Sequence, residues 1–151
     1  MTQRGIEAKP VEEIETLRLL EKLSKERAEE DADFGQTEIN SVIFRLQQRA
    51  GLYDKAALDI LTAVSHHTDP ELRADIPLGM DDVYPAYPEE VTAILVKLLQ
   101  DDNSDVSYEA REAVGIMLTG TAPSGSAGDM IPLYYEDAQQ LAAAFQEAPQ
   151  Q

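Results

Sequence analysis

Residues 98–118 read LLQDDNSDVSYEAREAVGIML, and their pattern decides the fold that we expect for the chain. Two leucines close one apolar segment, a polar stretch follows, and Val106 opens a second segment with apolar residues every three or four positions. That spacing places the apolar side chains on one face of a helix. We therefore expect two packed helices, joined by a turn in which Ser104 or Asp105 caps the second helix.

The aspartates of this turn also match part of a calcium-binding loop. Such a loop places oxygen ligands at positions 1, 3, 5, 9 and 12. Counted from Asp101, these positions hold Asp101, Asn103, Asp105, Glu109 and Glu112. However, the position that requires glycine holds Val106, and a β-branched residue resists the positive φ needed there. Ligation by Glu109 and Glu112 would also interrupt the apolar face. The packed turn is therefore favoured, and we predict no metal or other cofactor.

The same helical spacing recurs along the chain, and we find no convincing alternation of the kind that marks a strand. We expect Gly35 to end a first helix, Thr37 to cap a second, Gly51 to end it and Asp54 to cap a third. Pro77 should cut a short fourth helix. In all, helices are expected near residues 10–34, 37–51, 54–64, 70–76, 88–99, 105–118 and 136–146, the polar stretch KERAEEDAD forming the solvated end of the first.

These expected helices define the organisation of an all-α protein. Residues 1–9 are expected to be loose, and residues 10–118 to form one helical domain. Residues 119–130 contain the stretch TGTAPSGSAGD, whose glycine, serine and alanine content is typical of a flexible linker. Residues 131–147 should carry a C-terminal helix that either caps the domain or reaches a partner.

The stretch quoted first also matches a repeat pattern. Its first helix ends in Leu98 and Leu99, an aspartate-rich turn follows, and the second helix is filled by Val106, Ala110, Ala113, Val114 and Gly115. A weaker copy lies 34 residues earlier, with Leu61, Val64, Asp69, Leu72, Arg73 and Ile76 in register. These residues resemble HEAT-like, armadillo-type helical repeats over about residues 54–118. Ser107 departs from the family's usual arginine, and Pro77 truncates the earlier copy.

The resemblance implies a short, right-handed stack of antiparallel helical hairpins. A single hairpin cannot bury its apolar stripe alone, whereas stacked hairpins share a continuous core. About three hairpins are the minimum for stability. The chain has room for that number, and the final helix is suited to cap the open end.

The chain is strongly acidic, with 29 acidic and 12 basic residues and a formal net charge of −17. From Gly51 onward it has 18 acidic residues and four basic ones. Such a field repels phosphate backbones and anionic lipid, so we expect neither direct nucleic-acid binding nor membrane binding. The same field accelerates encounter with a basic protein, which is the partner that we expect. The alternative is that the acidity only keeps the chain soluble.

The chain contains no cysteine, which excludes disulfides, thiolate metal sites and thiol catalysis. Its longest apolar run is far shorter than the roughly 20 residues of a membrane span. The N-terminal residues MTQRGIEAKPVEEIE lack the apolar core of a secretion signal. We therefore expect a cytoplasmic protein, whose oligomeric state the sequence leaves open.

Two tyrosine pairs are the candidate anchors for a protein partner. Tyr84 and Tyr87 lie in YPAYPEE, and Tyr134 and Tyr135 lie in PLYYED. Tyrosines of this kind bury a large contact area at low entropic cost. The alternative is that they pack their loops onto the domain. The acidic turns complete the expected contact surface, with Asp81, Asp82, Asp101, Asp102 and Asp105.

No residue pattern indicates catalysis. His66 and His67 are adjacent, so a helix would point them about 100 degrees apart and prevent both from binding one ion. The stretch GTAPSGSAG lacks the Gly-Lys-Ser/Thr that completes a phosphate-binding loop. We therefore expect a non-enzymatic protein-interaction module. Its charge and size suit an immunity or inhibitor protein that blocks a basic partner such as a nuclease. The alternatives are a structural or accessory subunit of a larger assembly, or a divalent-cation-binding protein using residues 101–112.

Overall fold

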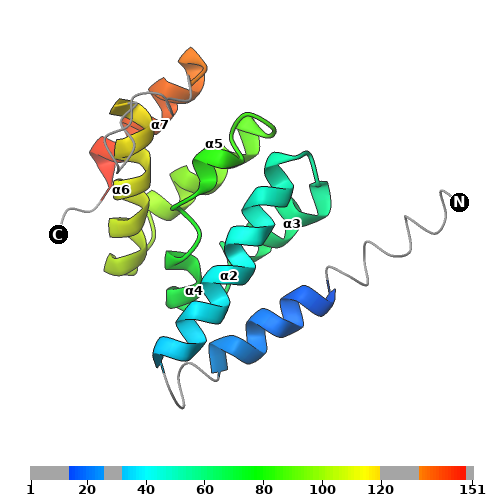
Figure 1. The fold of residues 1–151 in the computed structure, drawn as a ribbon. Helices are drawn as coiled ribbons and strands as arrows, with labels where there is room; N and C mark the ends of the chain where they lie inside the picture. The colour runs from blue at the N-terminus through cyan, green and yellow to red at the C-terminus, as the bar shows by residue number, and fades with distance from the viewer. Residues whose placement is uncertain (1–13, 26–31, 120–132, 149–151) are drawn as a thin grey trace, which may run out of the picture.

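The computed structural model describes residues 14–25, 32–119 and 133–148 of the chain. Every regular element within these residues is a helix, so the prediction of an all-α fold is confirmed (Figure 1). In chain order the elements are helix 14–25, α2 (Ala32–Gly51), α3 (Lys55–Val64), α4 (Pro70–Ala74), the 3₁₀ helix η1 (Met80–Asp82), α5 (Pro88–Leu99), α6 (Ser104–Thr119) and α7 (Tyr135–Glu147). Of the segments expected to be loose or flexible, 1–9 and 119–130, only Thr119 lies within the described residues, as the last residue of α6.

Apolar side chains from all of these helices meet in one core. α2 packs against α3, α4 packs against α6, and α5 packs against both α6 and α7 (Figure 1). Helix 14–25 contributes Leu20 and Leu23 to the core. Ser24 Oγ also donates a hydrogen bond to Asp69 Oδ2 over 2.5 Å, which ties this helix to the turn between α3 and α4. The core is therefore formed by residues that are far apart in the sequence.

α2 begins earlier than the sequence predicts. It starts at Ala32 and continues through Gly35 and Thr37, so the predictions that these residues end one helix and cap the next are wrong. A glycine inside a helix costs only about 1 kcal/mol relative to alanine. Burial of the α2 stripe around Ile39 and Ile43 stabilises the helix by more than that amount. Tertiary packing thus overrides a weak local stop signal.

α2 ends at Gly51, as predicted. Gly51 does not have a positive φ, however, and the residue just after the helix that does is Tyr53, at +69°. Gly51 is instead required by a close approach, because a Cβ at this position would lie 2.7 Å from the carbonyl oxygen of Asp82. The glycine therefore allows η1 to pack directly on α2. Asp54 caps α3 as predicted, accepting a hydrogen bond from the backbone N–H of Ala57.

The turn between α5 and α6 is a packed turn of the predicted kind. Val106 is fully buried as the first core residue of α6. The capping residue is Asn103 rather than Ser104 or Asp105, because Asn103 Oδ1 accepts hydrogen bonds from the backbone N–H groups of Asp105 (2.9 Å) and Val106 (3.2 Å). An amide oxygen accepts such bonds as well as a hydroxyl or carboxylate does, so spacing alone could not separate these neighbours.

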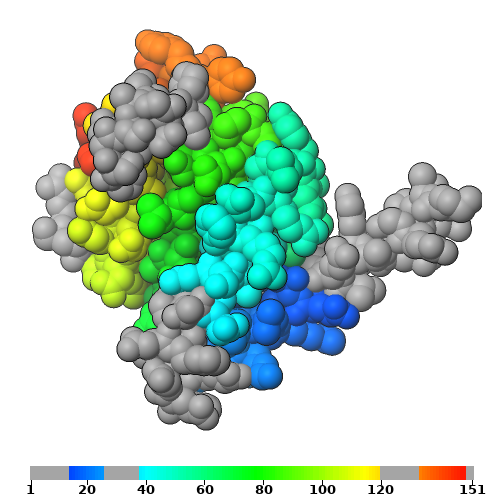
Figure 2. Space-filling model, in the orientation of Figure 1, coloured from blue at the N-terminus to red at the C-terminus, as the bar shows by residue number. Residues whose placement is uncertain are grey.

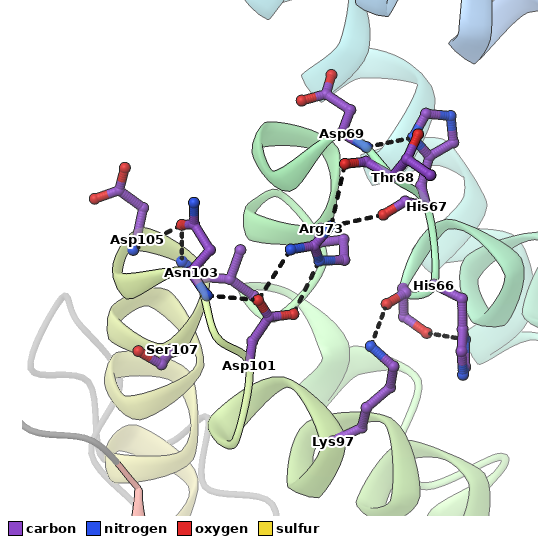
Figure 3. A network of polar contacts seen from close by, with 12 residues as sticks. His66, His67, Thr68, Asp69, Arg73, Lys97, Asp101, Asn103, Asp105 and Ser107 are labelled. Atoms are coloured by element: carbon purple, nitrogen blue, oxygen red, sulfur yellow. Dashed lines mark hydrogen bonds and ion pairs between the residues drawn. The ribbon is translucent and has the colours of Figure 1, made fainter.

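An ion pair joins this turn to the preceding one (Figure 3). Arg73 of α4 donates from Nε to Asp101 Oδ2 over 2.9 Å and from Nη2 to Asp101 Oδ1 over 3.0 Å. Its Nη1 donates to the backbone oxygen of His67 over 2.7 Å. Asp101 also accepts a hydrogen bond from the backbone N–H of Asn103. One guanidinium thus links the α3–α4 and α5–α6 turns.

Tyr84 fixes the position of α7. Its ring is buried, its hydroxyl donates to Asp137 Oδ2 over 2.6 Å, and its oxygen accepts from the backbone N–H of Tyr134 over 2.9 Å. Burial, together with the bond to Asp137, raises the pKa of Tyr84 to about 12. At the other end of α7, Arg111 Nη1 donates to the backbone oxygen of Phe145 over 2.9 Å. α7 therefore covers α5 and α6 rather than extending away from them.

Substitution of Tyr84 by phenylalanine is expected to lower the free energy of unfolding by about 1–2 kcal/mol. The ring remains, whereas the bonds to Asp137 and to the backbone of Tyr134 are lost. Amide hydrogen exchange should rise more in α7, whose N-terminal end holds both partners of the Tyr84 hydroxyl, than in α2. Tyr135→Phe is the matched control, since its hydroxyl is exposed and bonds only Gln139 in the described structure. Equal exchange in α7 of wild type and Tyr84→Phe would contradict the assigned role.

Candidate binding groove

A groove of about 910 Å³ runs between α2, α4, η1 and α6. The space-filling view shows α2 in cyan and α6 in yellow on either side of green residues from the middle of the chain (Figure 2). We call this hollow the α2–α6 groove. Its volume is within the range of sites that bind ligands or peptide segments.

The α2 side of the groove is uncharged. It presents Asn40, Ile43, Phe44 and Gln47, which follow the i, i+3, i+4, i+7 spacing of a single helix face. Phe44 is 58% exposed, although it is a large apolar residue, and Leu78 from the loop after α4 is 59% exposed at the same groove. Large apolar side chains that stay in water at a concave surface are typical of an interaction site.

The remaining sides of the groove are acidic. Carboxylates come from α4 and the residue after it, from η1 and from α6, namely Glu71, Asp75, Asp81, Asp82, Asp105 and Glu109. None of the described residues that line the groove is a lysine, arginine or histidine. A concave surface with charge of one sign focuses its field and raises the local concentration of cations.

Two of these carboxylates show the effect of this crowding in their pKa values. Burial raises the pKa of Glu109, and the negative charges of Glu112, Asp75 and Asp105 raise it further. Burial also raises the pKa of Asp82, with repulsion from Asp81 as the second cause. The ionised form of each carboxylate is therefore disfavoured in the free protein. A cation placed beside either one would favour that form.

The apolar rim is held in place by Gln47. Its Nε2 donates to the backbone oxygens of Ile76 over 3.1 Å and Leu78 over 2.8 Å. The loop then turns at Gly79, whose φ of +97° is open to glycine and strained for other residues. The Gln47 side chain is buried, so its amide fixes the backbone that carries Leu78. The exposed leucine therefore belongs to a rigid loop.

The residues that the sequence predicts as partner contacts lie in several places. Asp81, Asp82 and Asp105 line the α2–α6 groove. Asp101 does not, because its side chain is 6% exposed and bonds Arg73. Asp102 is exposed and lines a different hollow, to which Asp101 also contributes.

The tyrosines are also divided. Tyr84 is 1% exposed and so cannot serve as a surface anchor, which corrects that prediction in favour of the packing alternative. Tyr87 is half-buried, with its ring centroid 6.1 Å from that of Tyr53. Tyr134 and Tyr135 are exposed at the start of α7. They remain available for contact, although neither lines the groove.

Several groove residues were not among the predicted partner contacts, namely Phe44, Glu71, Asp75, Leu78 and Glu109. Phe44 could have been found, since it is a large apolar residue that lies outside the predicted core positions of its helix and is therefore expected to be exposed. Glu109 stands four residues after Asp105 and therefore on the same side of α6. Nothing in the sequence pattern places Leu78 at the same groove as Phe44, because the position of the Leu78 backbone depends on the long-range Gln47 bonds.

A second hollow, of about 690 Å³, is lined in part by polar groups that already have hydrogen-bond partners (Figure 3). Lys97 Nζ donates to the backbone oxygen of Ser65 over 2.7 Å. His67 Nδ1 accepts from the backbone N–H of Asp69 over 2.9 Å, and its Nε2 lies 2.6 Å from Glu21 Oε2. His66 Nδ1 lies 3.0 Å from the backbone oxygen of Thr62. The two histidines thus have separate partners, and this hollow is the weaker candidate.

Among the described residues, no group of three or more histidine, aspartate or glutamate side chains is arranged to hold a metal ion. Within the proposed calcium loop, both oxygens of Asp101 accept from Arg73, and Asn103 Oδ1 accepts from backbone amides. No helix in the described parts of the chain has the length and hydropathy of a membrane span. Comparison with protein-family models, curated proteins and solved structures found no match. The fold places the chain among all-α proteins.

Proposed function

We propose that the protein is a non-enzymatic interaction module that binds a basic protein partner in the α2–α6 groove. The observation that carries this proposal is the composition of the groove. Acidic residues line it without a lysine, arginine or histidine, and Phe44 and Leu78 are exposed beside them. Cationic side chains of a partner would replace the mutual repulsion of carboxylates such as Glu109 with attraction. The apolar residues would add contact area that excludes water.

We also propose that the helices form a short HEAT-like stack. Three features support it. α5 and α6 pack as neighbours across the aspartate-rich turn, α4 lies beside α6, and Arg73 joins the two turns that correspond in the repeat pattern. In such a stack, α2, α4 and α6 would lie on one side of the array and would together form the groove. α7 would then cap the end of the stack against α5 and α6.

The specific form of the proposal is a cytoplasmic immunity or inhibitor protein that blocks a basic nuclease. A nuclease binds phosphates through a cationic surface, and an acidic groove would compete for the same side chains. A role as a structural subunit is favoured by one separate feature. Leu52 and Tyr53 are exposed together in the α2–α3 turn, and the ring of Tyr53 contacts Tyr87. The divalent-cation alternative is disfavoured because Asp101 already pairs with Arg73.

The groove carboxylates are expected to control binding of a cationic nuclease. Combining Asp82→Asn, Asp105→Asn and Glu109→Gln should weaken the affinity about tenfold at low salt, since three ion pairs of roughly 0.2–1 kcal/mol each sum to about 0.6–3 kcal/mol. The slope of affinity against salt should also become shallower. Calorimetric titration at several salt concentrations measures both quantities.

A charge-matched variant separates the groove from the overall field. Glu89→Gln, Glu136→Gln and Glu147→Gln remove three exposed charges elsewhere and should weaken binding less than about threefold. The groove variant should melt no lower than wild type. In wild type, the pKa of Glu109 is raised in the folded state, so ionisation of Glu109 lowers the stability of the fold as pH rises through that pKa. Glu109→Gln removes this charge and therefore the associated loss of stability. Equal losses in both triple variants, or no binding of cationic proteins at all, would count against the proposed function.

A further inference from the structure

We infer that the occupant of the α2–α6 groove is a cationic amphipathic segment of the partner, with apolar side chains against α2 and Leu78 and basic side chains against α4 and α6. This inference rests on the proposed function and specifies the partner further. A basic protein could in principle meet an acidic surface through charge alone. The distribution of residues around the groove argues for a more specific occupant.

The two sides of the groove differ in chemistry. The α2 side presents four uncharged residues at i, i+3, i+4, i+7, with Phe44 exposed among them. The α4 and α6 sides carry Glu71, Asp75, Asp105 and Glu109. A ligand that matches both sides must itself have an apolar face and a cationic face. An amphipathic helix laid in a groove meets this requirement, with apolar anchors at the same i, i+3, i+4, i+7 spacing.

Shape and rigidity favour a segment over a folded surface. A groove of about 910 Å³ is concave, and a narrow segment can contact its floor and both sides together. Leu78 is held by the two bonds from Gln47, so its exposed position is present before a partner binds. A preorganised apolar contact lowers the entropic cost of association.

A second copy of the chain is a poor match for the same groove. Two copies would each bring the carboxylates of Asp82, Asp105 and Glu109 to the contact, and like charges placed face to face oppose association. The net charge of −17 on each copy adds a long-range repulsion. Charge complementarity therefore selects a cationic occupant over self-association.

Two labelled peptides of identical composition test the inference. Each has 18 residues of leucine and lysine, but one gathers the leucines on a single helical face and the other distributes them around the helix. Fluorescence anisotropy with wild-type protein should show the amphipathic peptide binding at least about tenfold more tightly than its isomer. The double variant Phe44→Gln/Leu78→Gln should remove that preference while retaining the weaker, charge-dependent binding of the isomer.

Leu52→Gln combined with Tyr135→Gln is the matched control, because it replaces two exposed apolar residues outside the groove. This control should keep the preference for the amphipathic peptide. Equal affinity for the two isomers would overturn the inference and leave the proposed function standing, provided that binding still depends on the groove carboxylates. If wild-type protein bound neither the nuclease nor either peptide, the proposed function would be overturned as well. Sedimentation showing a wild-type dimer that Phe44→Gln/Leu78→Gln converts to a monomer would assign the groove to a second copy.

Discussion

Replacement of Arg73 by methionine is expected to lower the free energy of unfolding by about 3 kcal/mol. Methionine keeps much of the side-chain volume but leaves the Asp101 carboxylate without its two guanidinium bonds. Asp101 is 6% exposed and Arg73 is 17% exposed, so water replaces those bonds poorly. Removing one partner of a buried ion pair typically costs about 3–5 kcal/mol, and the partial exposure of Arg73 favours the lower end. Urea denaturation followed by circular dichroism measures the change.

Two further variants identify the cause of that loss. Arg73→Lys keeps the charge but cannot form the forked pair of bonds, so an intermediate loss is expected. Asp101→Asn in the Arg73→Met background removes the uncompensated charge while retaining an acceptor for the backbone N–H of Asn103. The double variant should therefore be more stable than the sum of the single changes predicts. A loss below about 1 kcal/mol in Arg73→Met would show that the pair contributes as little as a surface pair.

The same pair gives the protein a dependence on acid. Burial by itself raises the pKa of Asp101, but the hydrogen bonds from Arg73 and Asn103 and the nearby positive charges outweigh burial, so the pKa is lowered. A lowered pKa in the folded state means that the stabilisation is present above the unfolded value of about 3.9 and is lost as pH falls through the folded value. The stability difference between wild type and Arg73→Met should accordingly shrink below roughly pH 4.

The sequence was a good guide where a local signal agreed with the packing, unlike the stop signal at Gly35. Helical spacing predicted the apolar stripe of α2 and the start of the α6 core at Val106, and the residue type of Asp54 predicted the α3 cap. These features depend on neighbours within one or two turns of helix. The same locality explains the small error at the α6 cap, where Asn103 stands next to the two residues that we expected.

The candidate groove was only partly predictable, because it depends on contacts between distant residues. Asp105 and Asp82 were expected to face a partner, but composition could not show that they converge with Glu109 on one hollow. Likewise, the sequence left open whether Tyr84 is a surface anchor or packs its loop, and its burial is accompanied by a hydrogen bond to Asp137, 53 residues later. Periodicity describes which face of a helix is apolar but not which distant element covers it.

The backbone at Gly79 also depends on a distant residue, Gln47, and its substitution gives the second large expected loss of stability. Gly79→Ala is expected to lower the free energy of unfolding by about 3–4 kcal/mol. A φ of +97° costs a residue with a Cβ about 1–3 kcal/mol. The added Cβ would also lie 2.3 Å from Gln47 Oε1, so the Gln47 side chain must move. That movement breaks its bonds to the carbonyls of Ile76 and Leu78, at a further cost of about 1–3 kcal/mol.

Gly115→Ala is the matched control for Gly79→Ala, because it makes the same chemical change inside α6. A Cβ at position 115 would lie 3.7 Å from Phe145 Cε2, an ordinary contact, and no positive φ is required there. Alanine should therefore stabilise α6 by about 0.5–1 kcal/mol. Adding Gln47→Ala to Gly79→Ala should cost less than the sum of the two single changes, since the clash disappears with the glutamine side chain. If Gly79→Ala unfolds within 1 kcal/mol of wild type, the Gln47 amide does not hold the loop. The rigid presentation of Leu78, on which preference for an amphipathic partner depends, would then lose its structural basis.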